Sequence, residues 1–557
     1  ILAERGAIDM AARRARLIER EVARLATSDE PTIVLGSTGT NRATAELMRA
    51  IARMPRGAVV LPGLDDAMPD KDWRLVSGLK GEDEPVHGHP QAALARLLSR
   101  LDASREDVLP LGRPPEILTK RRLFLSQALA PSETTPGWRA YVATHGHERA
   151  AALADVSLIE ADDEREEALA IAVCLREILE TPAATAALIT PDRAIARRVR
   201  AELARWGIMV DDSGGEPLGT TGAGAFARAA LTAAAEQSDV ACLALLGHDR
   251  VAPAADRART RELAQLIELA VLRATPHDPD WRARFDAARD SADDPHAHAA
   301  VKRIAEGDWA EMEQTALAID AALSPLRATQ ETLPVGAWIE RHSACLDALS
   351  RHAGAEIGED DIVLARLFAE AGALGDDAAL GMRFGLDEYR ALFDRLISGA
   401  TVRGPQHAHA RLKILGLLEA RLLDADLVVL AGLDEAIWPP QPKSDAFLNR
   451  PMRAQIGLTP PERRIGQSAH DFAMAMGARN VVMTRALKRA RAPTVASRFL
   501  QRIDALAGTE QSAALRARGA RWLALARLLD KPEETRPLPR PAPKPPVDLR
   551  PTALSVT

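Results

Sequence analysis

The chain has 557 residues, too many for one hydrophobic core, and this length predicts three or four domains of roughly 150 residues each. Hydrophobic and charged fractions of 47% and 27% are ordinary for a globular protein, and no long uncharged apolar run is present, so we expect no membrane span. A net charge of −6 does not mark a general polyanion binder, although a local basic patch is enough to bind phosphates. Three scattered cysteines predict a reduced, cytoplasmic protein without a disulfide framework.

The first predicted domain covers residues 1–150. Residues 1–28 have the charged, amphipathic pattern of a helix. A strand at 33–35, a helix at 43–53 and a strand at 58–61 follow. This alternation is typical of a parallel α/β sheet.

A second α/β unit is predicted over residues 151–235. Short apolar strands alternate with amphipathic helices, and the first helix begins with acidic residues that favour a helix N-terminus. The predicted strands are 156–160, 186–190 and 208–212, and the predicted helices are 162–180 and 191–207.

Strand patterns then stop, and residues 236–400 predict an all-helical insertion rich in Ala, Arg, Leu and Asp. Strand patterns return within residues 401–510, at RLKILG, LVVLAG and NVVMT. One α/β domain is therefore predicted to be split by a helical domain. Residues 511–557 predict a final helix and a proline-rich linker.

Four stretches of the sequence resemble the AddB family, the AddB subunits of AddAB helicase–nucleases, which process broken DNA ends for recombination. They are GSTGTNRATAELMRAIARMPRGAVVLPGLD (36–65), VDDSGGEPLGTTGAGAF (210–226), ILGLLEARLLDADLVVLAGLDEAIWPP (414–440) and FLNRPMRAQIGLTPPERRIGQSAHDFAMAMGARNVVMTRALKRARAPTVASRFLQR (447–502). The resemblance implies parallel α/β domains like those of superfamily 1 helicases, with a large all-helical insertion. By this resemblance, residues 1–150 are the end of a first helicase-like domain. Residues 151–235 and 401–510 are then the two halves of a second helicase-like domain.

The same resemblance implies the partners of the protein. They are DNA, as double-strand ends and single strands, and an AddA-type helicase–nuclease subunit. Family members carry a further N-terminal part and a C-terminal nuclease domain, so we interpret the chain as an internal fragment. The Mg²⁺ of that nuclease then belongs outside this sequence, and we assign no metal, cofactor or catalytic residue within it.

The ATP site of an active motor is not expected to function here. Such a site needs an acidic pair for Mg²⁺ and water at the end of a strand, but the strand ending at Leu35 is followed by neutral residues, and no carboxylate occurs before Glu46. The loop GLLE resembles the glycine–leucine–glutamate loop of active motors, without its preceding lysine and with ARLLDAD inserted after it. The degenerate nucleotide-site positions are Gly36, Ser37, Thr38, Gly416, Glu419, Asp434 and Glu435.

These positions also have plain structural interpretations, which we favour. The acidic residues can cap helices or form ion pairs with Arg421, Arg463 or Arg464, and GSTG at 36–39 can be a simple glycine turn rather than an anion nest. Trp438 is expected to fill a gap between domains rather than stack on a base.

Two further details of the third and fourth stretches concern local geometry. Ala436 replaces a glycine usual in AddB relatives, which makes a positive-φ turn there less expected. His470 and Asp471 are adjacent in a helix and are not expected to face each other.

A basic stretch near the end of the second α/β domain is the candidate DNA contact. It contains no acidic residue, and we expect it to bind phosphates, although a solvated surface beside an acidic partner is the alternative. Arg485 lies on or after a strand, which favours a DNA or structural contact over a role as an ATP-sensing finger. The seven residues are Arg479, Arg485, Lys488, Arg489, Arg491, Arg498 and Arg502.

The sequence therefore predicts an ATP-silent, helicase-like scaffold subunit that binds DNA and a partner helicase. Two alternatives stay open at this point. One is an active ATP-dependent superfamily 1 helicase, and the other is an interaction scaffold without DNA contact.

Overall fold

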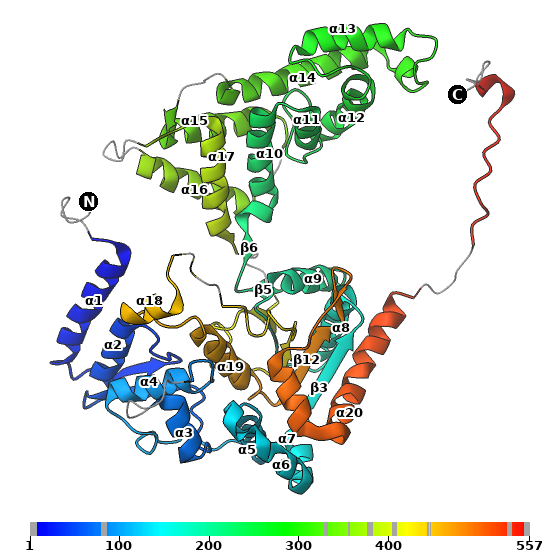
Figure 1. Ribbon diagram of the computed structural model, residues 1–557. Helices are drawn as coiled ribbons and strands as arrows, with labels where there is room; N and C mark the ends of the chain where they lie inside the picture. The colour runs from blue at the N-terminus through cyan, green and yellow to red at the C-terminus, as the bar shows by residue number, and fades with distance from the viewer. Residues whose placement is uncertain are drawn as a thin grey trace. The chain divides into compact units, whose positions relative to one another are not determined.

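The computed structural model divides into two compact units, Ile1–Gly207 with Leu417–Thr557, and Ile208–Gly416 (Figure 1). Within the part that it describes, no helix is both long enough and apolar enough to cross a bilayer. Parts of the predicted linker, and the last seven residues of the chain, lie outside the described residues. The described ranges are 8–78, 86–327, 332–354, 357–375, 382–403, 409–442, 445, 447–531 and 537–550.

The first unit begins with a small α/β element. Strand β1 (Thr32–Leu35) pairs in parallel with β2 (Gly57–Val60), and helix α2 (Arg42–Ala52) connects them along the chain. The bounds of all three elements are close to the predicted ones. The Asn41 side chain accepts a hydrogen bond from the N–H of Ala43 and so starts α2. Its other helices are α1 (Met10–Leu25), α3 (Asp70–Ser77), α4 (Ala92–Leu101), α5 (Glu116–Ala128), α6 (Trp138–Thr144) and α7 (Gly146–Ala152).

A six-stranded parallel sheet follows, with strand order β3-β12-β11-β4-β10-β5. Strands from before and after the helical unit are hydrogen-bonded to one another, because β11 and β12 lie between β3 and β4. The strand predicted over 208–212 shrinks to two residues. The strands are β3 (Val156–Ala161), β4 (Ala186–Ile189), β5 (Asp211–Asp212), β10 (Leu412–Leu415), β11 (Leu427–Leu430) and β12 (Asn480–Ala486).

Helices cover this sheet and one of its edges. Helix α20 packs against edge strand β3 so closely that a Cβ on Gly519 would collide with the backbone of Leu158. Arg518 donates to the carbonyl oxygen of Val156 at 2.7 Å, which satisfies a group on the edge of the sheet that has no strand partner. These helices are α8 (Glu164–Ile178), α9 (Arg193–Ala204), α19 (Arg463–Ala475) and α20 (Arg498–Leu529); the short helix α18 (Arg450–Gln455) precedes α19 in the chain.

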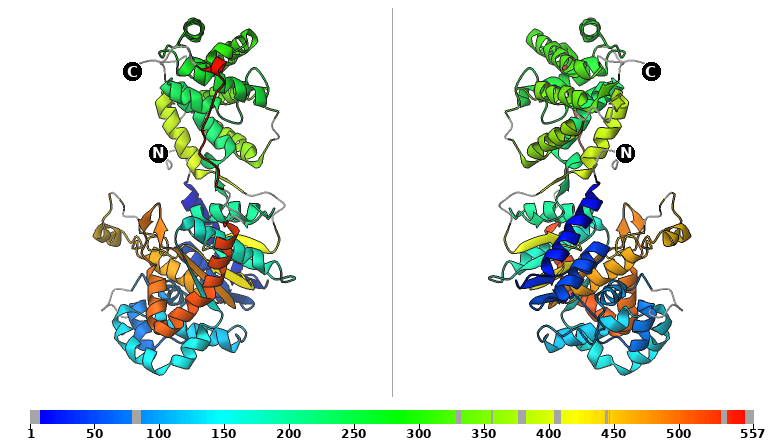
Figure 2. Two further views of the ribbon diagram at one scale, coloured as in Figure 1. Left: turned by 90° about the vertical axis from the view of Figure 1, so that its right-hand side faces the viewer. Right: turned by 90° about the vertical axis from the view of Figure 1, so that its left-hand side faces the viewer.

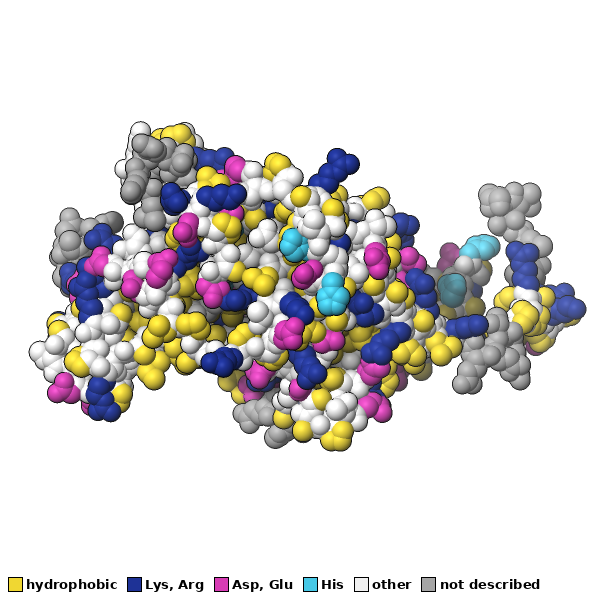
Figure 3. All heavy atoms as spheres, turned by 90° about the horizontal axis from the view of Figure 1, so that it is seen from below, with side chains coloured by type: hydrophobic (Ala, Val, Ile, Leu, Met, Phe, Trp, Pro, Cys, Tyr) yellow, Lys and Arg dark blue, Asp and Glu magenta, His cyan; other side chains and the backbone are white. Residues whose placement is uncertain are grey.

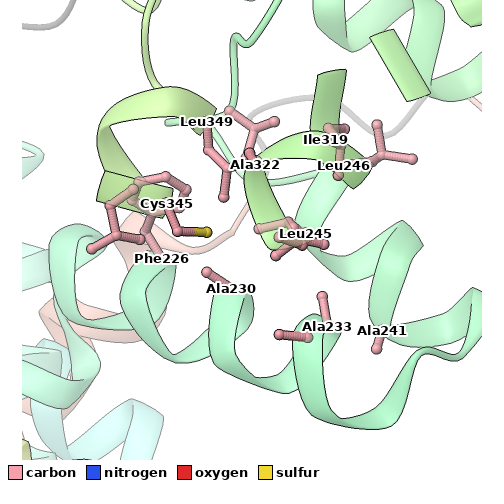
Figure 4. Close-up of a cluster of buried hydrophobic side chains, with 14 of the residues drawn as sticks. Phe226, Ala230, Ala233, Ala241, Leu245, Leu246, Ile319, Ala322, Cys345 and Leu349 are labelled. Atoms are coloured by element: carbon pink, nitrogen blue, oxygen red, sulfur yellow. The ribbon is translucent and has the colours of Figure 1, made fainter. Parts of the chain in front are cut away.

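The second unit is mainly helical, and Figure 2 shows its helices, in green, from two further sides. Alanine-rich faces bring the helices close together: Phe226 and Ala230 point toward Cys345 in its core (Figure 4). The all-helical character predicted for 236–400 is corrected by one short antiparallel ladder, β7 (Leu333–Pro334) with β8 (Arg383–Phe384). A second ladder, β6 (Glu216–Pro217) with β9 (Thr401–Val402), lies just outside those bounds. Ladders of two residues are too short to give a strand periodicity.

The helices of this second unit are α10 (Gly222–Glu236), α11 (Asp239–Leu246), α12 (Arg257–Ile267), α13 (Trp281–Ala292), α14 (Glu306–Arg327), α15 (Val335–Leu349), α16 (Glu359–Gly375) and α17 (Leu386–Gly399). A buried His342 is held between the carbonyl oxygen of Ala227, at 3.0 Å, and the hydroxyl of Tyr389, at 3.2 Å. Burial lowers the pKa of His342 to about 4, so this histidine is neutral in the folded protein.

Candidate functional site

The carboxyl ends of the parallel strands are where ligand sites usually form in open α/β sheets. In this protein, that edge holds a cluster of acidic and basic side chains from segments far apart in the sequence. The cluster, which we call the paired cluster, consists of Glu160, Glu167, Asp192, Asp434, Arg485 and Arg489.

Asp434 lies at the centre of the paired cluster and is 2% exposed. Arg485 donates from Nε to Oδ1 at 3.2 Å, and Arg489 donates from Nε to Oδ2 at 2.8 Å. The turn after β11 positions the aspartate through two positive-φ residues, Gly432 (φ 75°) and Ala436 (φ 73°). Ala436 thus adopts the conformation that its side chain made less expected.

Glu167, on the first turn of α8, is completely buried behind Asp434. Its carboxylate accepts hydrogen bonds from the N–H of Gly432 at 3.0 Å and from the hydroxyl of Thr484 at 2.6 Å, and it pairs with Arg489 at 3.2 Å. Burial raises the pKa of Glu167 to about 7, against the opposing effect of Arg489. Glu167 therefore changes its protonation state near neutral pH.

Arg489 contacts three carboxylates, those of Glu167, Asp192 and Asp434. Burial alone would lower its pKa, but these neighbours raise the pKa overall. Arg485 also binds Glu160, at 3.4 Å, and the hydroxyl of Thr494, at 2.9 Å. Both guanidinium groups are therefore fully occupied inside the protein.

This arrangement corrects three predictions. Arg485 and Arg489 are not available as phosphate contacts, because each is held by buried or half-buried carboxylates. The ion pairs predicted for Asp434 with Arg421, Arg463 or Arg464 do not form; Arg421 pairs with Asp471 at 2.8 Å instead. The candidate DNA residues and the candidate nucleotide-site acids are thus partners of one another.

Glu435 and Arg498 form a second, more exposed pair at the start of α20. The Glu435 carboxylate accepts from Nε of Arg498 at 3.1 Å and from its backbone N–H at 3.1 Å, so it also caps the helix. Arg502, one turn on, donates from Nε to the carbonyl oxygen of Ala128 at 2.7 Å, and its guanidinium lies 4.8 Å from the ring centre of Trp138. Arg502 therefore has a structural role, which its prediction as a DNA contact missed.

Besides Arg498, three predicted DNA residues are exposed: Arg479, Lys488 and Arg491. None of the three forms an ion pair with any residue that the structure describes. Lys488 and Arg491 lie on a hairpin in which β13 (Lys488–Arg489) pairs with β14 (Ala492–Pro493). Ala490 (φ 46°) and Arg491 (φ 69°) form its two-residue turn, with both residues in the left-handed region, as in a type I′ hairpin.

The loop at 36–40 is held by neutral contacts and one arginine. The Ser37 hydroxyl accepts from the N–H of Gly39 at 3.2 Å, and the buried Thr38 donates to Gln467 at 3.4 Å. The side chain of Leu422, from the inserted ARLLDAD segment, packs against Gly36. Among the described residues, no carboxylate is hydrogen-bonded to this loop.

The remaining nucleotide-site positions do not join the paired cluster. Gly416 donates its N–H to the hydroxyl of Ser213 at 3.3 Å within the second unit. Glu419 is exposed and has no ion-pair partner in the described part of the chain.

Trp438 and His470 are core residues. The indole N–H of Trp438 donates to the carbonyl oxygen of Ala431 at 3.0 Å, and its ring is fully buried against Phe472. His470 does contact Asp471, with Nδ1 and Oδ1 3.1 Å apart, which corrects the expectation that the two do not face each other. His470 Nε2 is also 2.9 Å from the carbonyl oxygen of Pro62. The contact with Pro62 therefore joins α19 to a distant segment of the core.

A cleft of about 940 Å³ lies in the first unit, between residues 86–90, residues 129–132 and the starts of α18, α19 and α20. Its walls contain more arginine than acid, a property that sequence reasoning missed because the wall residues come from distant segments. The charged wall residues are Arg450, Arg453, Glu462, Arg498 and Arg502. On the face shown in Figure 3, by contrast, basic and acidic side chains are interspersed.

A scan of protein-family models finds no match to this chain, and a search of curated proteins finds none either.

Proposed function

We propose that this chain is an AddB-type, helicase-like scaffold that is silent toward ATP, binds DNA and acts with an AddA-type helicase–nuclease subunit at double-strand ends. The resemblance of four stretches supports the family. A parallel sheet whose strands come from both sides of a helical unit agrees with a second motor domain of the superfamily 1 type.

The observation that carries the proposal is the state of the acidic residues. A motor binds Mg²⁺ and activates water with free carboxylates. Here Asp434 is paired with the buried Arg485 and the half-buried Arg489, Glu167 is paired with Arg489, and the loop at 36–40 has no carboxylate partner in the described part of the chain. Neither place supplies the paired negative charge that ATP hydrolysis requires.

DNA contact rests on two basic surfaces rather than on the whole predicted stretch. The first is formed by Arg479, Lys488 and Arg491, which are exposed and lack ion pairs among the described residues. The second is the arginine-lined cleft, where Arg450, Arg453 and Arg498 each keep one carboxylate partner and Arg502 has none among the described residues. Lys and Arg that face phosphates give sequence-independent binding that weakens with salt.

The test combines ATP hydrolysis by the chain joined to the N-terminal part that the resemblance implies with DNA binding by the purified chain. We expect no ATP hydrolysis above background with single-stranded DNA, and DNA affinity measured by anisotropy should fall steeply between 50 and 200 mM salt. DNA-stimulated hydrolysis would contradict the silent scaffold and favour an active motor. Absence of DNA binding at the lowest salt would favour the interaction scaffold.

A further inference from the structure

Three arginines outside the basic stretch converge beside the loop at 36–40. Arg96 and Arg100 lie on one face of α4, four residues apart, and Arg463 is the first residue of α19, which packs against α4. The Arg463 guanidinium donates to the carbonyl oxygen of Thr40 at 2.8 Å, and Arg96 lies 2.7 Å from Nδ1 of His87. We call these three residues the unpaired cluster.

The unpaired cluster has no compensating negative charge in the described residues. Each of its arginines is half-buried, and none forms an ion pair there. The acids nearest along α19 are already engaged, Glu462 with Arg450 and Asp471 with Arg421.

The electrostatics agree with this geometry. Burial lowers the pKa of Arg96, and Arg100 lowers it further; the pKa of Arg463 is lowered by burial and then by Arg96 and Arg100. Guanidinium groups remain charged in proteins, so the repulsion cannot be removed by losing a proton. The folded chain therefore holds a positive field that an anion would relieve.

The loop at 36–40 adds backbone hydrogen-bond donors beside the three arginines. The backbone N–H groups of Ser37, Thr38 and Thr40 have no hydrogen-bond partner among the described residues, while Gly36 (φ 72°) and Gly39 (φ 56°) give the loop its tight left-handed bends. Successive free N–H groups in such bends bind anionic oxygens. Arginine forks match the geometry of a phosphate group.

We propose that Arg96, Arg100 and Arg463, with the loop at 36–40, form a binding site for a phosphate group, supplied by the backbone of single-stranded DNA. The site itself is independent of the chain's family, whereas DNA as the source of the phosphate rests on the proposed function. His87, which contacts Arg96, also lines the arginine-rich cleft, so one strand could contact both.

The experiment uses the whole chain and inorganic pyrophosphate as the probe, at ionic strength matched with NaCl. Calorimetry should show pyrophosphate binding to the wild type, and Arg96→Gln with Arg463→Gln should weaken it at least about tenfold, which corresponds to about 1.4 kcal/mol. Arg464→Gln, which removes an exposed charge next to the site, is the matched control and should change the affinity less than about twofold.

Thermal unfolding separates a binding site from a structural role. Without pyrophosphate, the double variant loses the contacts with Thr40 and His87 together with the repulsion, so its unfolding temperature should stay close to that of the wild type. With pyrophosphate, only the wild type should gain stability. Equal gains in the wild type and the double variant would overturn the site. Failure of pyrophosphate to bind the wild type would also overturn the proposal.

Competition identifies the source of the phosphate. A single-stranded oligonucleotide should displace pyrophosphate from the wild type, and ATP should do so no better than pyrophosphate itself. Displacement by ATP alone would overturn DNA as the source. Pyrophosphate binding without any DNA binding would reject the proposed function while leaving the phosphate site in place.

Discussion

The paired cluster and the unpaired cluster place arginines in similar half-buried positions and give them opposite surroundings. Arg489 is enclosed by three carboxylates, and its pKa is raised. Arg463 has two other arginines as its charged neighbours, and its pKa is lowered. The comparison teaches that the number of basic residues in a stretch says little about anion binding. The positions of the acidic partners in the fold decide which cations remain available.

The substitution with the largest expected effect removes Asp434, the central carboxylate of the paired cluster. Asp434→Ala should lower the free energy of unfolding by about 3–5 kcal/mol, because it leaves the buried Arg485 and the half-buried Arg489 with fewer counter-charges. Denaturant unfolding measures this change. Glu435→Ala, in the adjacent and more exposed pair with Arg498, is the control and should cost about 1 kcal/mol or less. Equal, small losses for both would show that Asp434 does not organise the cluster.

A pH titration of stability tests a second member of the paired cluster, Glu167. The pKa of Glu167 is raised from 4.5 to about 7 in the folded chain, so folding favours its protonated form. The stability that this group contributes is complete below its ordinary pKa and is lost as pH rises through 7, on the order of 2 kcal/mol between pH 5 and 7.5. Glu167→Gln should remove that part of the pH dependence. An unchanged pH profile in the variant would contradict the assignment.

The sequence predicted those elements whose residue pattern lies within one short stretch of the chain. The apolar run at 427–430 and the alternation of strand and helix at 32–60 predicted elements that the structure contains within a few residues. The partner of Asp434 was not predictable, because Arg485 is 51 residues away and meets it only through the register in which Leu430 of β11 lies opposite Met483 of β12.

The unpaired cluster was hidden for the same reason. Arg463 contacts Thr40 across 423 residues of sequence, and neither α4 nor α19 carries an unusual run of basic residues. Only the packing of the two helices brings their arginines together. A search for basic stretches therefore selected residues 479–502, of which several are neutralised, and passed over three that are not.

The next smaller expected effect is on the salt dependence of DNA binding, and it comes from substitutions in the exposed hairpin. Lys488→Ala with Arg491→Ala should reduce the salt slope of single-strand binding by about 1.4, if each side chain neutralises one phosphate. The loss should not depend on the DNA sequence, because phosphates carry none. Arg366→Ala, an exposed arginine of the second unit that pairs with Glu370, should leave the slope unchanged. Identical slopes for all three proteins would remove the hairpin from the DNA surface.

The smallest effect concerns the turn that positions Asp434, and it has opposite signs at two positions of that turn. Ala436 has a φ of 73°, which costs an alanine about 1 kcal/mol, so Ala436→Gly should raise the free energy of unfolding by about 0.5 kcal/mol after the added entropy of the unfolded chain is subtracted. Gly432→Ala should lower it by about 1–2 kcal/mol, because φ is also positive there and a Cβ would lie 3.3 Å from Nη2 of Arg489. Denaturant unfolding of the two variants measures both signs. Two losses would show that Ala436 makes contacts worth more than its backbone strain, and two gains would show that the turn does not hold Asp434 against its arginines.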